Sequence, residues 1–140
     1  MEKVKYEKRV WYPNMKETET LIWERFLVAF PEAYDTVIYN LKLGEGAEIP
    51  ENTPENFARM WEGLTQPKID VVGFKGSSMD IIEIKPYGGA AAVGQVIFYN
   101  DLYLRHIDPT AKPNLVILTD IERMDTKFVC EKNNIKLVVV

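Results

Sequence analysis

The 140-residue sequence predicts an α/β fold, in which helices flank a central mixed β-sheet. Short runs of β-forming residues alternate with longer helical patterns, and two neighbouring runs are joined by a turn that makes a hairpin. A compact apolar run at residues 115–118 is typical of a strand buried on both faces. The length suits a single domain spanning residues 1–140.

The N-terminal half predicts two helices with a strand between them. Asn14 as a cap, with Glu17 three residues later, indicates a helix start, and the apolar run 21–30 continues that helix to Pro31. Residues 36–43 are rich in β-formers and predict a strand. A short helix is expected to start at Pro54, because apolar residues follow at helical spacing: Phe57, Met60, Trp61 and Leu64.

The C-terminal half completes the sheet. Residues 68–74 and 79–85 predict a hairpin around the turn at 76–78, and a long apolar helix is expected over 90–106. After the buried strand at 115–118, we expect a helix over about 121–133, capped by Asp120, and a last strand over 135–140.

Composition restricts the chemistry. There is one cysteine, Cys130, and one histidine, His106, so neither an intramolecular disulfide nor a Cys/His zinc site can form. Any metal must therefore have oxygen ligands, which favours Mg²⁺, Mn²⁺ or Ca²⁺. With no apolar run of 18 residues, we expect a soluble, cytoplasmic protein with no membrane partner. The net charge of −4 argues weakly against nucleic-acid binding.

Three charged residues on the predicted hairpin form the candidate site. Side chains alternate across a strand, so Glu83 and Lys85 share a face, and pairing of the two strands would place Asp70 beside Glu83. Two adjacent carboxylates repel unless a cation lies between them, and a divalent cation can activate water for attack on phosphorus. Lys85 would orient that water or neutralise charge on the phosphate. The alternative is an ordinary solvated sheet face.

In these residues the chain resembles the PD-(D/E)XK nuclease superfamily, whose core runs helix, three strands, helix, strand (αβββαβ, restriction-endonuclease-like). Asp70 and the Glu83-Ile84-Lys85 tripeptide match its motif, although Ile69 stands where the family has proline. The resemblance implies that Asp70, Glu83 and the Ile84 carbonyl hold Mg²⁺ or Mn²⁺, and that Lys85 acts near the attacking water.

Two further matches extend the resemblance. Many members carry a metal-assisting glutamate on the first helix, for which Glu24 is the candidate and Glu17 the fallback. RecB-like members carry Gln-x₃-Tyr on the helix after the catalytic strand, which Gln95 and Tyr99 match, and these two would contact nucleic acid. The alternatives are a surface role for Glu24 and a core role for Tyr99.

The resulting expectation is a Mg²⁺- or Mn²⁺-dependent nuclease acting on DNA, with RNA as the other candidate substrate. The small chain favours structure- or end-dependent cleavage over sequence-specific cleavage, and would suit a homodimer and a phage or mobile-element origin. Two alternatives stay open: a catalytically silent nuclease-fold module for nucleic-acid binding or assembly, and an unrelated α/β interaction domain.

Overall fold

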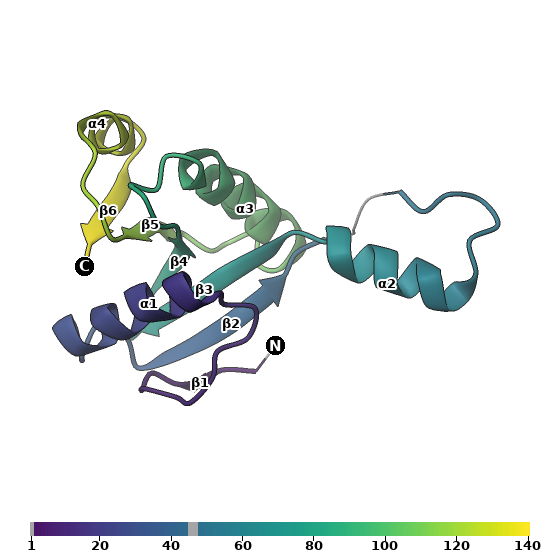
Figure 1. The fold of residues 1–140 in the computed structure, drawn as a ribbon, viewed down its shortest axis with the longest axis horizontal. Coiled ribbons are helices and arrows are strands. Elements are labelled where there is room, and N and C mark those ends of the chain that lie inside the picture. The colour runs from purple at the N-terminus through teal and green to yellow at the C-terminus, as the bar shows by residue number, and fades with distance from the viewer. Residues whose placement is uncertain (1, 45–47) are drawn as a thin grey trace.

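A computed structural model describes residues 2–44 and 48–140, with the backbone alone at 62–64. It has a six-stranded sheet in the order β1-β2-β3-β4-β5-β6 and four helices (Figure 1). The strands are β1 (Val4–Lys5), β2 (Thr36–Lys42), β3 (Lys68–Lys75), β4 (Ser78–Ile84), β5 (Asn114–Thr119) and β6 (Ile135–Val139). The helices are α1 (Glu17–Ala29), α2 (Glu55–Thr65), α3 (Ala92–His106) and α4 (Met124–Lys132).

The sheet is mixed. Strands β1 to β4 are antiparallel neighbours, whereas β4, β5 and β6 are parallel and are connected through α3 and α4. The predicted α/β class, with a mixed sheet and flanking helices, is therefore confirmed.

The side-chain alternation of β4 separates two helical layers. Ile82 and Ile84 face α1, where Trp23 and Phe26 are buried against them, whereas Ile81 points to the opposite face with Tyr103 of α3. A third cluster joins α3 and α4 over β5 and β6. Glu83 lies between Ile82 and Ile84 in sequence and therefore points to the opposite face of β4, towards α3.

Helix α2 and the loop before it project away from the sheet (Figure 1). The exposed apolar side chains Phe57, Met60 and Trp61 line a small hollow together with Pro50 of that loop, and the Trp61 indole N–H donates to the Glu48 carbonyl at 3.3 Å. The predicted helix is present, while the Leu64 side chain lies outside the described residues.

Two predicted helix caps are wrong. Helix α1 begins after Lys16, whose backbone N–H donates to Glu19 Oε1 at 3.0 Å, while Asn14 adopts a left-handed conformation (φ 57°) before it. Helix α4 begins only at Met124, after Arg123, whereas Asp120 lies outside the helix and accepts the backbone N–H of Tyr87 at 2.7 Å. Strand β1 was not predicted, since two residues are too few to produce a pattern. Among the described residues, no helix is long and apolar enough to cross a bilayer.

Candidate active site

Asp70 and Glu83 lie where β3 and β4 separate. The strands pair from Lys75↔Ser78 as far as Val71↔Ile82, and the ladder stops there. Beyond it, the Asp70 N–H donates to Glu83 Oε1 at 3.1 Å, and the Ile84 N–H donates to Asp70 Oδ2 at 2.9 Å. Two carboxylates thus replace backbone acceptors across the gap, and the structure brings the predicted pair together.

The ladder is also interrupted on the other side of Asp70. Strand β2 pairs with β3 at Tyr39↔Val71 and Leu41↔Ile69, but not at Asn40, the residue between them that faces Asp70. Asn40 has a φ of 54°, which strand residues rarely adopt and which Asn tolerates better than most. Asp70 therefore lies at a local break in the sheet, and such distortions concentrate at functional sites.

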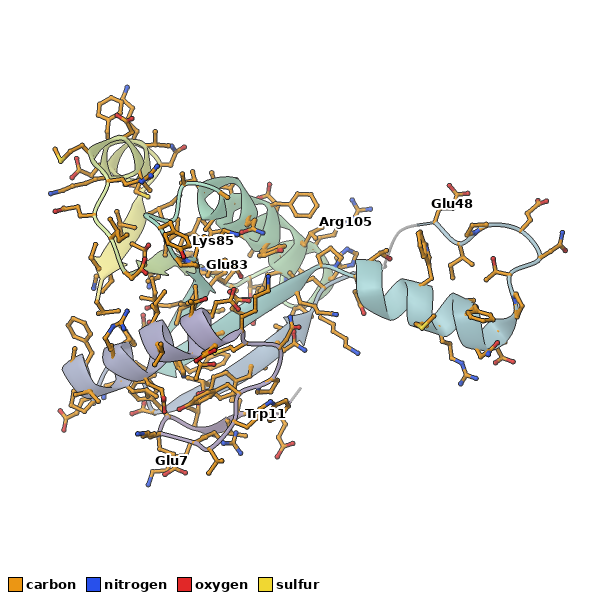
Figure 2. The ribbon with its side chains drawn as sticks, in the orientation of Figure 1. Glu7, Trp11, Glu48, Glu83, Lys85 and Arg105 are labelled. Atoms are coloured by element: carbon orange, nitrogen blue, oxygen red, sulfur yellow. The ribbon has the colours of Figure 1, made fainter. Side chains whose placement is uncertain are left out.

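The pair opens into a concave site, here called the carboxylate pocket, with a volume of about 890 Å³. Side chains from four elements converge on it: Glu19 from α1, Asp70 from β3, Glu83 from β4, and Gln95 and Tyr99 from α3, with Lys85 directly after β4. Figure 2 shows Glu83 and Lys85 between the ribbons of α1 and α3.

The surroundings of Asp70 and Glu83 disfavour the simultaneous ionisation of both carboxylic acids. Burial raises the pKa of Glu83, whose side chain is almost inaccessible, and the negative charge of Asp70 raises it further. Burial also raises the pKa of Asp70, against the lowering effects of the Ile84 N–H and Lys85. The charge of Glu19 raises both values. Without a bound cation, the pair therefore retains a proton above the usual pKa range of carboxylic acids.

The donor set of the pocket suits a magnesium-like ion. Across the described residues 2–44 and 48–140, no three His, Cys, Asp or Glu side chains are arranged to hold a metal together. Glu19 therefore influences the pair through its charge without completing a three-ligand cage. Mg²⁺ is commonly held by one or two carboxylates and keeps several waters, whereas Ca²⁺ takes six to eight oxygen ligands. Asp70 and Glu83 thus fit Mg²⁺ or Mn²⁺ better than Ca²⁺.

The acid that α1 contributes is Glu19, not Glu24 or Glu17. Glu24 accepts the Tyr12 hydroxyl at 3.4 Å and lies 3.9 Å from Lys8 Nζ, about 140° around the helix from Glu19. Glu17 is exposed. One sequence signal could have found Glu19: it precedes the buried Trp23 by four residues, so the two share one helix face.

Gln95 and Tyr99 both line the pocket, one helical turn apart. Burial raises the pKa of the Tyr99 hydroxyl, and the charges of Glu83 and Asp70 raise it further, so the hydroxyl stays protonated and can donate. Phe98, half-exposed at the pocket rim, was not predicted.

The loop after Lys85 is fixed by backbone conformation and hydrogen bonds. Tyr87, Gly88 and Gly89 all have positive φ values, of 60°, 94° and 75°. The Gly88 N–H donates to Thr119 Oγ1 at 2.9 Å, and a Cβ on Gly89 would approach Ile117 Cγ2 to 2.8 Å. This tight turn holds the end of β4 against β5 and leads the chain into α3.

Comparison with known proteins bears on the fold alone. No family model matches the chain, and no curated protein matches it. The structure is similar to the crystal structure of a protein of unknown function, AF1548, with a TM-score of 0.50 and 13% sequence identity. The similarity covers 86% of this chain, which spans only 57% of the other.

Proposed function

We propose that this chain is a Mg²⁺- or Mn²⁺-dependent nuclease of the PD-(D/E)XK type, hydrolysing phosphodiester bonds of DNA. The observation that carries the proposal is the juxtaposition of a buried carboxylate, Glu83, and a partly buried one, Asp70, in a pocket that also holds Lys85. The break in the sheet on both sides of Asp70 supports it.

The pair is a costly way to satisfy the two backbone N–H groups at the β3–β4 gap. Each carboxylate loses hydration on burial, and each disfavours ionisation of the other. Continued backbone pairing between β3 and β4 would satisfy the same two N–H groups at lower cost. A divalent cation between the carboxylates would offset both the desolvation and the repulsion, so the arrangement is explained if it binds such an ion.

The roles of the residues follow from their placement. When bound, a divalent ion supplies Lewis-acid polarisation of the phosphate and a water of lowered pKa. Asp70 and Glu83 would hold that ion, with the Ile84 carbonyl as the further ligand that the family resemblance implies. Lys85 would place its positive charge beside the attacking water or the phosphate oxygens, and the Tyr99 hydroxyl and the Gln95 amide would donate to the backbone of the substrate.

Structure- or end-dependent cleavage suits the charge of the chain. Sequence-specific duplex binding usually rests on many phosphate contacts from basic residues, and this chain has a net charge of −4. We therefore propose recognition through a few contacts around the pocket rather than through an extended basic surface.

The test is cleavage of single-stranded, duplex, flapped and branched DNA with Mg²⁺ or Mn²⁺. We expect wild type to cut at least one of these substrates and Asp70→Asn to lose more than about 100-fold of the rate, since the variant removes one metal ligand. Absence of cleavage by wild type on every substrate, or equal rates for the variant, would overturn the proposal.

The alternative function is a catalytically silent nuclease-fold module for nucleic-acid binding or assembly. Calorimetric titration with Mn²⁺ separates the two. Binding that Glu83→Gln abolishes supports the enzyme, whereas no Mn²⁺ binding together with no cleavage supports the silent module.

A further inference from the structure

A second hollow lies beside the carboxylate pocket, on the outer side of β2. This N-terminal groove, with a volume of about 530 Å³, is lined by Arg9 and Trp11 of the N-terminal segment and by Asn40 and Lys42 of β2. β1 covers only the start of the β2 edge, at Thr36 and Val37. Figure 2 shows Trp11 below β2, on the opposite side of that strand from Glu83 and Lys85.

The groove and the carboxylate pocket adjoin along the border between β2 and β3. Lys42 lines the groove, and its direct cross-strand partner Lys68 lines the pocket. The N-terminal segment also connects the two hollows, because Pro13 lines the groove and the next residue, Asn14, lines the pocket. A chain-like ligand leaving the pocket across this border therefore enters the groove.

The segment that carries Trp11 is anchored, although Trp11 itself is exposed. Tyr12 is buried, packs edge-to-face on Tyr39 with ring centroids 5.5 Å apart, and accepts the Arg9 backbone N–H on its hydroxyl at 2.9 Å. Trp11, the next residue towards the N-terminus, is 69% exposed. A tryptophan held in solvent by a fixed backbone offers a ready stacking platform.

Two lysines, Lys42 and Lys68, face each other at the border. Like charges directly opposite each other on neighbouring strands are destabilising. In the described ranges, no acidic side chain forms an ion pair with either lysine. An anion at this border would turn the unfavourable pair into a binding site. Arg9 adds a third positive charge in the groove, and Glu2 a negative one.

We propose that the N-terminal groove binds the single-stranded part of a nucleic-acid substrate whose scissile phosphate lies in the carboxylate pocket. Phosphates would contact Lys68, Lys42 and Arg9, and an unpaired base would stack on Trp11. A single strand fits better than a duplex, because the indole can stack only on a base that is free of its partner. The inference rests on the proposed nuclease function and names its substrate class.

Binding is tested without metal, so that no cleavage occurs. Fluorescence anisotropy of a labelled 12-nucleotide oligo-dT is measured in EDTA with wild type, Trp11→Ala and the matched control Trp61→Ala, which removes the exposed tryptophan of α2. We expect Trp11→Ala to weaken binding about tenfold or more, as loss of one stacked base does, and Trp61→Ala to stay within about twofold. Equal affinities for the two variants would overturn the proposal.

The lysine pair has its own readout. Replacing Lys42 and Lys68 together by Ala should reduce the slope of log affinity against log salt by about 0.7 for each phosphate that the variant no longer neutralises. The control is the double replacement of Lys112 and Lys132, two exposed lysines outside the groove and the pocket. If the salt dependence of binding is unchanged in the Lys42/Lys68 variant, the strand does not cross the border between the pocket and the groove at these lysines.

Cleavage in Mg²⁺ keeps the two proposals distinguishable. If wild type cuts the 12-nucleotide oligomer and Trp11→Ala raises KM with little change in kcat, both proposals are supported. If wild type cuts but Trp11→Ala has the same KM, the groove is refuted and the nuclease stands. If nothing is cut while binding depends on Trp11, the nuclease is refuted and the groove remains as a binding site.

Discussion

Strand β4 carries two acids with opposite surroundings. Asp80 accepts the Tyr34 hydroxyl on Oδ2 at 2.6 Å and the Asn114 amide on Oδ1 at 3.0 Å, so both its oxygens meet neutral donors. Glu83, on the other face of the strand, lies beside a second carboxylate, that of Asp70. The first arrangement is complete within the protein. Under the proposed function a cation would complete the second, and this contrast would separate a structural acid from a functional one.

The largest expected effect is on cleavage. Glu83→Gln should reduce the rate more than about 100-fold, because the variant removes a charged ligand of the metal, while Asp80→Asn should leave the rate within about twofold. The measurement is single-turnover cleavage of the best DNA substrate in Mg²⁺. Comparable losses in both variants would erase the distinction between the two acids.

Metal binding should stabilise the protein only through the Asp70–Glu83 pair. At a Mg²⁺ concentration about 100 times its Kd, the free energy of unfolding should rise by about 2.7 kcal/mol in wild type and in Asp80→Asn, but not in Glu83→Gln. Thermal denaturation with and without Mg²⁺ measures this. A Mg²⁺-dependent shift that survives Glu83→Gln would place the ion elsewhere.

In the absence of metal, replacing Glu83 and replacing Asp80 should change the stability of the protein in opposite directions. The pKa values of Asp70 and Glu83 are raised in the folded protein. Below about pH 4 both groups are protonated in the folded and the unfolded state, so their contribution to the free energy of unfolding is fully present. That contribution falls as pH rises through the raised pKa values. Between about pH 6 and pH 9, Glu83→Gln should therefore stabilise the metal-free protein by at least about 1 kcal/mol.

Asp80→Asn should instead destabilise it by about 1–3 kcal/mol, because the new NH₂ group faces a donor, either Tyr34 or Asn114. Urea unfolding in EDTA from pH 4 to 9 measures both variants. A wild-type stability that rises with pH over this range because of the pair would contradict the expected loss of stability.

The smallest expected effect concerns the acids of α1. Glu19→Gln should lower cleavage up to about tenfold, since Glu19 adds negative charge beside the pair without direct ligation, which corresponds to about 1.4 kcal/mol. Glu24→Gln, on another face of the helix, should leave cleavage unchanged. The rates are compared at saturating Mg²⁺. A larger loss of rate in Glu24→Gln than in Glu19→Gln would show that Glu24, and not Glu19, is the acid of α1 that assists the pair.

Alternation and β-propensity were enough to predict that Asp70 and Glu83 meet, because hairpin register follows from a short turn. Helix phase was enough to place Gln95 and Tyr99 on one face. For α1 the sequence reasoning named Glu24, with Glu17 as the fallback, because Glu24 interrupts an apolar run. The structure instead places Glu19 at the pocket, on the helix face that it shares with Trp23.

The sheet break at Asn40 could not be predicted either, since a left-handed residue inside a strand depends on tertiary context. Nor could the partner of Asp120. That residue resembles a helix cap in sequence, but it binds a loop that is distant along the chain.

The connection between β2 and β3 has a consequence for engineering. These strands are direct antiparallel neighbours, and the Leu43 N–H donates to the Pro67 carbonyl at 2.8 Å, so their ends already lie at hairpin distance. The excursion through α2 returns the chain almost to its starting point (Figure 1). We therefore expect that a short turn between β2 and β3 can replace the excursion through α2, and that the same position offers a point at which a foreign domain can be grafted.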